Sequence, residues 1–239
     1  MKSRWRFWRR PRALWPQAWL LVFMLRVIYW PIKKWLLNVE VINQQVIPKR
    51  GPVILAGNHI SDTDPPLEMA AVPLRRTPVA MAMAELWRVP GLNIMLWLLG
   101  QISVDRKDRQ SGLRAFQRAI KVLEHNGLIV IYPEGGCSRD GKLRKFKSGV
   151  ADLALSIPDA VVIPMHISGS DQLKRPGEHS MDRSAPVRIA FGDPIKSDGF
   201  IGVDRRAQYL KNLADRIQDL APAGYYEPDL DPEDAAPAA

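Results

Sequence analysis

The stretch "PVILAGNHISDTDPPLEMAA", residues 52–71, decides the fold because it joins a strand to a helix through a polar loop. Its first residues, 52–58, form a nearly unbroken apolar run, which is typical of a strand buried inside a sheet. Pro65 and Pro66 suit the first turn of a helix, where a backbone N–H is not needed. His59 and the aspartates that follow it therefore lie on a strand-to-helix loop.

The alternation of strand and helix continues outward from this unit. The patterns predict an edge strand at 39–47, further strands at 52–58, 77–84, 101–106, 128–136, 160–168 and 186–195, and helices that begin at 67 and span 89–100, 111–127, 149–157 and 204–220. Strands that alternate with helices predict an α/β fold with a mixed, largely parallel sheet flanked by helices. We expect this domain to cover residues 39–220.

The charge of the chain is concentrated at its start. The formal net charge is +9, and residues 1–39 contain nine Lys or Arg and no acid, so the rest of the chain sums to zero. The last segment, 221–239, contains five acids and four prolines and no base, which predicts a disordered tail. The single cysteine, Cys137, excludes an intrachain disulfide and favours a reducing compartment.

The basic start of the chain is also rich in tryptophan, because residues 1–39 hold six of the eight tryptophans. Basic residues between tryptophans suit an anionic bilayer surface, and the apolar run "AWLLVFML" (18–25) favours a bilayer over nucleic acid. From Gln17 to Trp30 a helix without proline would extend about 21 Å, short of the roughly 30 Å hydrocarbon core. We therefore expect residues 1–38 to form a kinked helix pair in one leaflet, monotopic on the cytoplasmic face of the cell membrane, with a single span as the alternative.

Three loops at the expected carboxyl edge of the sheet carry the ionisable residues. They are "NHISDTD" (58–64), "VDRKDR" (104–109) and "PEGGCSRDGKLRKFKSG" (133–149). In such sheets the loops beyond the carboxyl ends of the strands form the site. A histidine beside many cations indicates an anionic substrate with a group to be deprotonated. A hard cation held by His59, Asp62 and Asp64 is the competing interpretation, but no second histidine-rich segment supports it, and we expect no metal.

Four sequence blocks resemble those of a known family, in the same order. "NHISDTD" contains His59-x4-Asp64; "GQISVDR" (100–106) is similar to the second block; "YPEGGCS" (132–138) resembles Phe-Pro-Glu-Gly-Thr-Arg-Ser; and "VVIPMHI" (161–167) resembles a Val-Pro block. The family is that of the 1-acyl-sn-glycerol-3-phosphate (lysophosphatidate) acyltransferases. The resemblance covers about residues 35–200 and implies a membrane-associated acyltransferase of phospholipid biosynthesis.

The resemblance implies a reaction between an acyl thioester and a lysophospholipid. The donor would be acyl-CoA or acyl carrier protein, and the acceptor most simply the sn-2 hydroxyl of 1-acylglycerol 3-phosphate, which gives phosphatidate. No other cofactor and no nucleic acid is expected. Removing the hydroxyl proton needs a base with a pKa near neutrality, which histidine has. His59 would be that base, and Asp64 would orient its ring and stabilise the imidazolium.

The resemblance also gives the phosphate-binding role to a second set of residues: Arg106, Glu134 and Gly135. The chain departs from the family here, because Gly136 and Cys137 replace the Thr-Arg pair. Arg139 or Lys142 would then supply the missing cation. This departure leaves open a different acceptor, such as a lyso-aminolipid or a glycolipid. A non-catalytic membrane or nucleic-acid adaptor is the alternative from another class, although it gives no reason for the four blocks to occur together.

Overall fold

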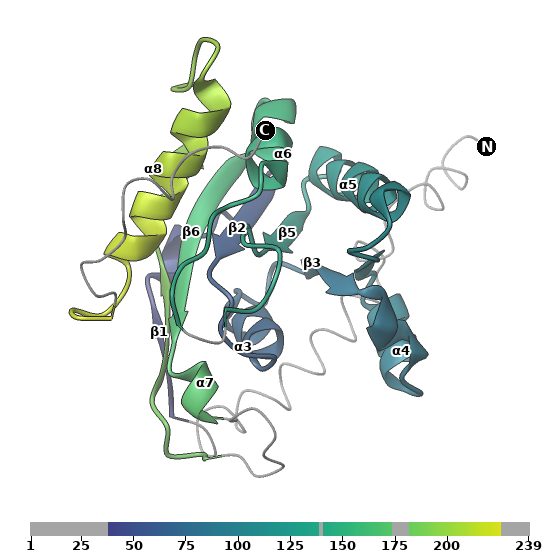
Figure 1. Cartoon of the computed structure of the whole chain (residues 1–239), viewed down its shortest axis with the longest axis vertical. Helices are drawn as coiled ribbons and strands as arrows, with labels where there is room; N and C mark the ends of the chain where they lie inside the picture. The colour runs from purple at the N-terminus through teal and green to yellow at the C-terminus, as the bar shows by residue number, and fades with distance from the viewer. Residues whose placement is uncertain (1–37, 139–140, 174–181, 226–239) are drawn as a thin grey trace.

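The computed structural model describes residues 38–138, 141–173 and 182–225 (Figure 1). Within these ranges the strands form one eight-stranded sheet in the order β1-β7-β6-β2-β5-β3-β4, with β8 paired to β6. The bounds are β1 Val39–Ile42, β2 Val53–Gly57, β3 Pro78–Met83, β4 Ile102–Val104, β5 Leu128–Ile131, β6 Val161–Ser168, β7 Val187–Phe191 and β8 Ile195–Lys196. All neighbours are parallel except β6 with β7 and β6 with β8. The expected mixed, largely parallel sheet is confirmed.

Each face of the sheet carries its own hydrophobic core, because successive side chains of a strand point to opposite faces. On β2, Ile54 and Ala56 join one core, while Val53 and Leu55 join the other. The first core is covered by helices α5 (Arg109–Glu124), α6 (Gly149–Ser156) and α8 (Arg205–Asp219). The second is covered by α3 (Asp64–Ala71) (Figure 1). Burial on both faces explains the continuous apolar composition of the central strands.

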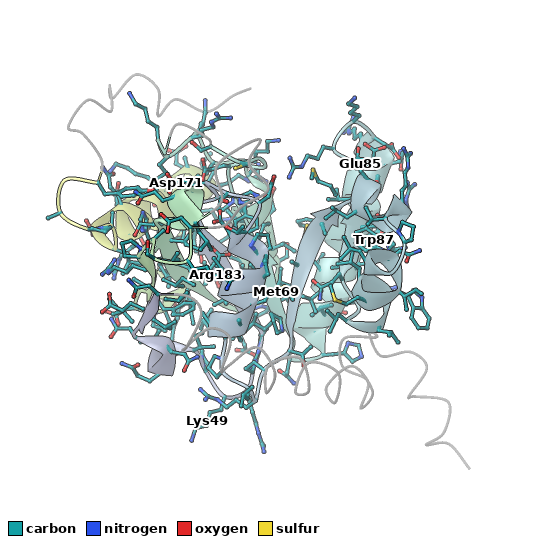
Figure 2. The ribbon with its side chains drawn as sticks, turned by 90° about the horizontal axis from the view of Figure 1, so that it is seen from below. Lys49, Met69, Glu85, Trp87, Asp171 and Arg183 are labelled. Carbon is teal, nitrogen blue, oxygen red and sulfur yellow. The ribbon has the colours of Figure 1, made fainter. Side chains whose placement is uncertain are left out.

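One end of the sheet, at β3 and β4, carries the 3-10 segment η3 (Ala84–Arg88) and helix α4 (Leu92–Leu98). Figure 2 shows Glu85 and Trp87 of η3 on the side of the molecule opposite Asp171 and Arg183. Asp171 belongs to the one-turn helix α7 (Ser170–Leu173). No helix within the described ranges combines the length and the apolar character needed to cross a bilayer.

Three predicted strands differ from those in the structure. The strand predicted at 128–136 ends at Ile131, because the chain turns there and the N–H of Gly135 donates to the carbonyl of Tyr132 (3.0 Å). The strand predicted at 39–47 ends at Ile42, because Asn43 adopts a left-handed conformation (φ 57°) and a 3-10 turn, η2 (Gln44–Val46), follows. The strand predicted at 186–195 breaks into β7 and β8. Gly192 still donates its N–H to the carbonyl of Pro164 (2.8 Å), its partner in the β6–β7 register, but Pro164 has no N–H to donate in return, and β8 pairs with β6 in a register shifted by one residue.

The segments predicted at the two ends of the chain lie largely outside the described residues. The predicted membrane-associating segment, residues 1–38, is described only at residue 38, and the predicted tail only over 221–225. In this short piece the ring of Tyr225 lies edge-on against His166, with the centroids 4.8 Å apart. Residues 221–225 are therefore in contact with the domain.

The parallel pairing of the strands brings the three loops with ionisable residues together. Strand β2 lies between β5 and β6 and is parallel to both, and β5, β3 and β4 continue the parallel set. The carboxyl ends of β2, β5 and β4 therefore meet at one edge. His59, Tyr132 and Asp105 follow these ends directly, so this edge is where the site forms.

Candidate active site

The centre of the site is a buried histidine–aspartate pair. The Nδ1 atom of His59 lies 2.8 Å from Oδ2 of Asp64, and the two residues are 7% and 0% exposed. His59 leaves the end of β2, and Asp64 opens α3, where the prolines at the first two helical positions fix the entry of the helix. The His-x4-Asp spacing is therefore a loop that closes on itself.

The Oδ2 atom of Asp64 acts only as a hydrogen-bond acceptor. The backbone N–H groups of Ile60 and Ser61 donate to the same Oδ2 of Asp64, at 2.7 and 2.8 Å. Since Oδ2 is an acceptor for three donors, Nδ1 of His59 carries the proton of the shared hydrogen bond. The lone pair of the neutral ring then lies on Nε2, which makes no hydrogen bond to any described residue. His59 can therefore act as a base through the free lone pair on Nε2.

The backbone of His59 is held by the loop after β5. Its N–H donates to Oε1 of Glu134 (3.1 Å), and its carbonyl accepts from the N–H of Ser138 (2.6 Å). The side chain of Asn58 exchanges two hydrogen bonds with the backbone of Ile167 on β6, at 2.8 and 2.9 Å. These contacts fix the position of His59 from both neighbouring strands.

A second pair, formed by Tyr132 and the buried Glu68, lies beside the first. The ring of Tyr132 stacks on the imidazole of His59, with the centroids 4.3 Å apart and the planes 18° apart. The hydroxyl of Tyr132 donates to Oε2 of Glu68 (2.6 Å), and Glu68 is 0% exposed. Burial is the main cause that raises the pKa of Glu68 well above its usual value, followed by the charge of Asp64. Both effects favour the protonated form of Glu68.

A groove of about 810 Å³ begins at Tyr132 and runs between the first turns of α5 and α6. Its apolar lining includes Met81, Val104, Leu113, Phe116, Ile131 and Leu153, and its cations are Arg106, Arg109 and Lys147. None of these three cations forms an ion pair with a described residue. The wall also holds the carboxylates of Asp105, Asp108 and Asp152, and the last two pair with arginines outside the groove. An apolar channel whose cations remain unpaired suits an amphiphile with an anionic head.

The structure places the predicted phosphate-binding residues unevenly. Arg106 lines the groove, close to the backbone of Gly136. Glu134 uses both carboxylate oxygens on backbone N–H groups, of His59 and of Arg144, so its side chain joins two loops. The N–H of Gly135 is bonded within its turn to the carbonyl of Tyr132 (3.0 Å). Gly135 leaves room for the side chain of Lys147, because a Cβ at position 135 would lie 2.7 Å from Lys147 atoms.

The remaining candidates lie apart from this centre. Lys142 is exposed and does not line the groove, and Arg139 lies outside the described residues. Asp62 is exposed on the loop, in keeping with a solvated role. Within the described residues no three His, Cys, Asp or Glu side chains are grouped to hold a metal ion.

Sequence reasoning missed Asn58, Glu68, Tyr132 and Lys147. Tyr132 carried a usable signal, because it occupies the Phe position of the third block. Glu68 carried a weaker one, since it lies four residues after Asp64 and therefore on the same face of the helix. For Lys147, one cation in a run of five Lys or Arg from 139 to 147, the sequence held no distinguishing signal.

A buried histidine–aspartate pair at the carboxyl edge of a mixed sheet, beside a basic and apolar groove, defines an α/β protein with a His-x4-Asp site. The sequence identifies the family of the protein. The acyltransferase family model matches residues 38–168, and the chain belongs to the acyltransferase family. The blocks that carried the resemblance fall within or directly beside this range.

Relatives with similar sequences carry one name. The chain is 36% identical over 135 residues to the 1-acyl-sn-glycerol-3-phosphate acyltransferase of Borreliella burgdorferi, which covers 55% of this chain and 52% of that protein. It is 28% identical to the protein of the same name from Limnanthes douglasii, over 76% of this chain and 63% of that protein. The chain thus matches only about half to three fifths of the length of these relatives.

A solved structure shares the fold. It is the 1-acyl-sn-glycerophosphate acyltransferase PlsC of Thermotoga maritima, with a TM-score of 0.66 and 25% identity, over 84% of this chain and 78% of that chain. The predicted fold class is confirmed by this likeness as well as by the sheet itself.

Proposed function

We propose that the protein is a 1-acylglycerol-3-phosphate O-acyltransferase that moves an acyl group from a thioester to the sn-2 hydroxyl of lysophosphatidate. The observation that carries the proposal is the geometry of His59 and Asp64 in a chain whose relatives bear this name. The geometry supplies a base, and the groove beside it suits an anionic amphiphile.

In the proposed reaction the substrate itself provides the nucleophile. Nε2 of His59 takes the proton of the acceptor hydroxyl as its oxygen attacks the thioester carbonyl carbon. The C–O bond forms, the C–S bond breaks, and the imidazolium returns its proton to the departing thiolate. Asp64 stabilises the imidazolium between these two steps and keeps the ring in the tautomer that presents Nε2.

The groove is the proposed place of the acceptor. Its cations, Arg106, Arg109 and Lys147, would bind the phosphate, and its apolar wall would take part of an acyl chain. Arg106 is the strongest candidate, since a guanidinium can bind two phosphate oxygens at once. Lys147 is proposed for the role predicted for Lys142, because Lys147 lines the groove and Lys142 does not.

The donor and the location are proposed with the reaction. The donor is acyl-CoA or acyl carrier protein, and the protein is peripheral or monotopic at the cytoplasmic face of the membrane. The basic, tryptophan-rich residues 1–38 support membrane contact, with residues 39–220 as the catalytic domain and the segment from 221 as a tail.

The test is acyl transfer from labelled acyl-CoA to a panel of lysolipids by detergent-solubilised protein. His59→Ala should lower kcat on the order of 10² to 10⁴-fold, the range of general-base catalysis. Asp64→Asn should have a comparable effect, because the ring loses its orienting acceptor. Asp62→Asn is the matched control on the same loop and should keep full activity. Full activity in His59→Ala would refute the mechanism.

Gly136 and Cys137, which stand where the family has Thr-Arg, favour a second candidate in which a different lysolipid is the acceptor. The same panel decides between the two. Acylation of a lyso-aminolipid or glycolipid in preference to lysophosphatidate would keep the reaction and replace the acceptor. If neither acyl-CoA nor acyl carrier protein supports any transfer, the adaptor alternative gains ground.

A further inference from the structure

Helix α3 reaches the imidazole of His59 by two routes. The direct route is the hydrogen bond from Nδ1 to Asp64 at the start of the helix. The indirect route begins at Glu68, one turn further on, which accepts the hydroxyl of Tyr132 at 2.6 Å, and Tyr132 stacks on His59. One rigid element thus contacts the edge of the ring directly and its face through a tyrosine.

The direct route leaves one motion of the ring unrestrained. A single hydrogen bond at Nδ1 fixes the edge of the imidazole but permits the ring to tilt about the line between Nδ1 and Oδ2. Tilting moves Nε2, the atom that would take the proton. A parallel aromatic ring with its centroid 4.3 Å away blocks this tilt on one side.

The anchor of Tyr132 depends on its hydroxyl. Tyr132 occupies the position of a phenylalanine in the family's third block, and a phenylalanine could stack on His59 but has no hydroxyl to bind. The partner, Glu68, is a fully buried carboxyl whose Oε1 has no hydrogen-bond partner among the described residues. Burying such a group with one partner is costly. An apolar side chain would fill the same space at a lower cost in desolvation free energy. The buried carboxyl therefore indicates a role beyond packing.

We propose that Glu68 is a positioning residue for the acyl transfer: through the hydroxyl of Tyr132 it holds the tilt of the His59 imidazole. The inference rests on the proposed function for its kinetic consequence, but the geometry of the ring can be measured without activity.

The kinetic test is a double-mutant cycle. Tyr132→Phe and Glu68→Leu each break the link and should each lower kcat about tenfold with KM within twofold, because displacing a reacting group by about 1 Å costs up to 100-fold. The double variant should be no slower than either single variant, since both remove one shared interaction. Glu68→Gln keeps an acceptor for the hydroxyl and should restore kcat to near the wild-type value.

A matched control separates positioning from packing. Tyr209→Phe removes the hydroxyl of a fully buried tyrosine on α8, and this hydroxyl has no hydrogen-bond partner among the described residues. It should leave kcat unchanged. A purely structural role for Glu68 would lower the melting temperature of Glu68→Leu while the folded fraction kept the wild-type kcat.

A second measurement needs no substrate. In protein labelled with carbon-13 histidine, the His59 ring signals are identified by their loss in His59→Gln, and Tyr132→Ala gives their position without a stacked ring. In Glu68→Leu and Tyr132→Phe the signals should move from the wild-type position toward that of Tyr132→Ala. Signals that stay at the wild-type position would overturn the proposal, even if no lysolipid proves to be an acceptor.

The kinetic outcomes are equally decisive for Glu68. A rise in KM at constant kcat in Tyr132→Phe would mean that Tyr132 contacts substrate in the groove, and the positioning role would be lost. Additive losses in the double variant would mean that the two residues act separately. Absence of any transfer by the wild-type protein would refute the proposed function alone, and the ring signals would still decide the role of Glu68.

Discussion

Arg76 is a buried charge that the structure uses away from the site. It is 5% exposed, and its guanidinium donates to the carbonyls of Pro48, Gly51 and Gly127, at 2.8 to 3.3 Å. Burial lowers the pKa of Arg76 to about 10, so the group stays charged at neutral pH. One side chain thereby joins the turns that precede β2 and β5, at the edge of the sheet opposite the site.

We expect Arg76→Met to lower the free energy of unfolding by about 2 to 4 kcal/mol, because it removes three hydrogen bonds that a buried, charged guanidinium donates. Urea unfolding measures this difference. Arg75→Met is the matched control: Arg75 is exposed and donates to the carbonyl of Ile47, so the loss should stay below about 1 kcal/mol. Equal losses in the two variants would contradict a special role for Arg76.

At this scale the sequence predicts residues that act through local spacing and misses those that act across the fold. His59 and Asp64 are five positions apart, and the loop between them closes the hydrogen bond, so a motif suffices. Asn58 and Ile167 lie 109 positions apart, and Glu68 and Tyr132 lie 64 apart. Such pairs depend on strand order and register, which hydrophobic patterns do not specify.

At the scale of elements, the existence of strands and helices follows from the pattern, while their ends follow from local backbone geometry. Strand β2 was predicted because buried parallel strands have continuous apolar composition. The end of β1 depends on the left-handed backbone of Asn43, and the end of β7 on the contact of Gly192 with β6. The antiparallel pairing of β6 with β7 could not be predicted either, because both directions suit the same apolar run.

Helix α4 and the residues beside it expose more apolar side chains than packing of the core explains. No Asp, Glu, Lys or Arg occurs from Val89 to Val104. Val89 is 45% and Ile94 61% exposed, and Leu113, which lines the groove, is 49% exposed. Exposed apolar side chains on and beside a helix without charges suit contact with the bilayer from which a lipid acceptor would come. Figure 2 shows Trp87 of η3 at this end of the molecule, on the side away from Asp171.

We therefore expect Val89→Asp with Ile94→Asp in the full chain to weaken binding to anionic lipid vesicles by about tenfold, since each substitution removes apolar contact and adds repulsion. Sedimentation with vesicles measures the change. Ile201→Asp with Val203→Asp is the matched control, because these apolar residues are 82% and 100% exposed on the segment before α8. Binding that is unchanged in the first pair, or equally weakened in the second, would exclude α4 as a contact surface.

At the scale of the whole molecule, two buried groups give stability opposite dependences on pH. Burial lowers the pKa of His166 to about 4, with a further contribution from Arg188. Below about pH 6.5 the unfolded chain gains a proton on this residue that the folded chain does not, so stability falls as the pH falls toward 4. Glu68 acts in the other direction. Its folded pKa is raised, so above about pH 4.3 the unfolded chain loses a proton that the folded chain keeps, and stability falls as the pH rises.

Each side of the resulting stability curve can be assigned to its residue by a substitution that cannot titrate. Urea unfolding between pH 4.5 and 8.5 should show a flatter decline toward alkaline pH in Glu68→Gln and a flatter decline toward acid in His166→Gln, by up to about 1.4 kcal/mol for each pH unit. The slope is the quantity to compare, because either substitution also changes contacts at every pH. His125→Gln, which removes an exposed histidine, is the control for the acid side. A wild-type slope in Glu68→Gln would mean that Glu68 is ionised in the folded protein, and the buried cluster beside His59 would then carry two negative charges rather than one.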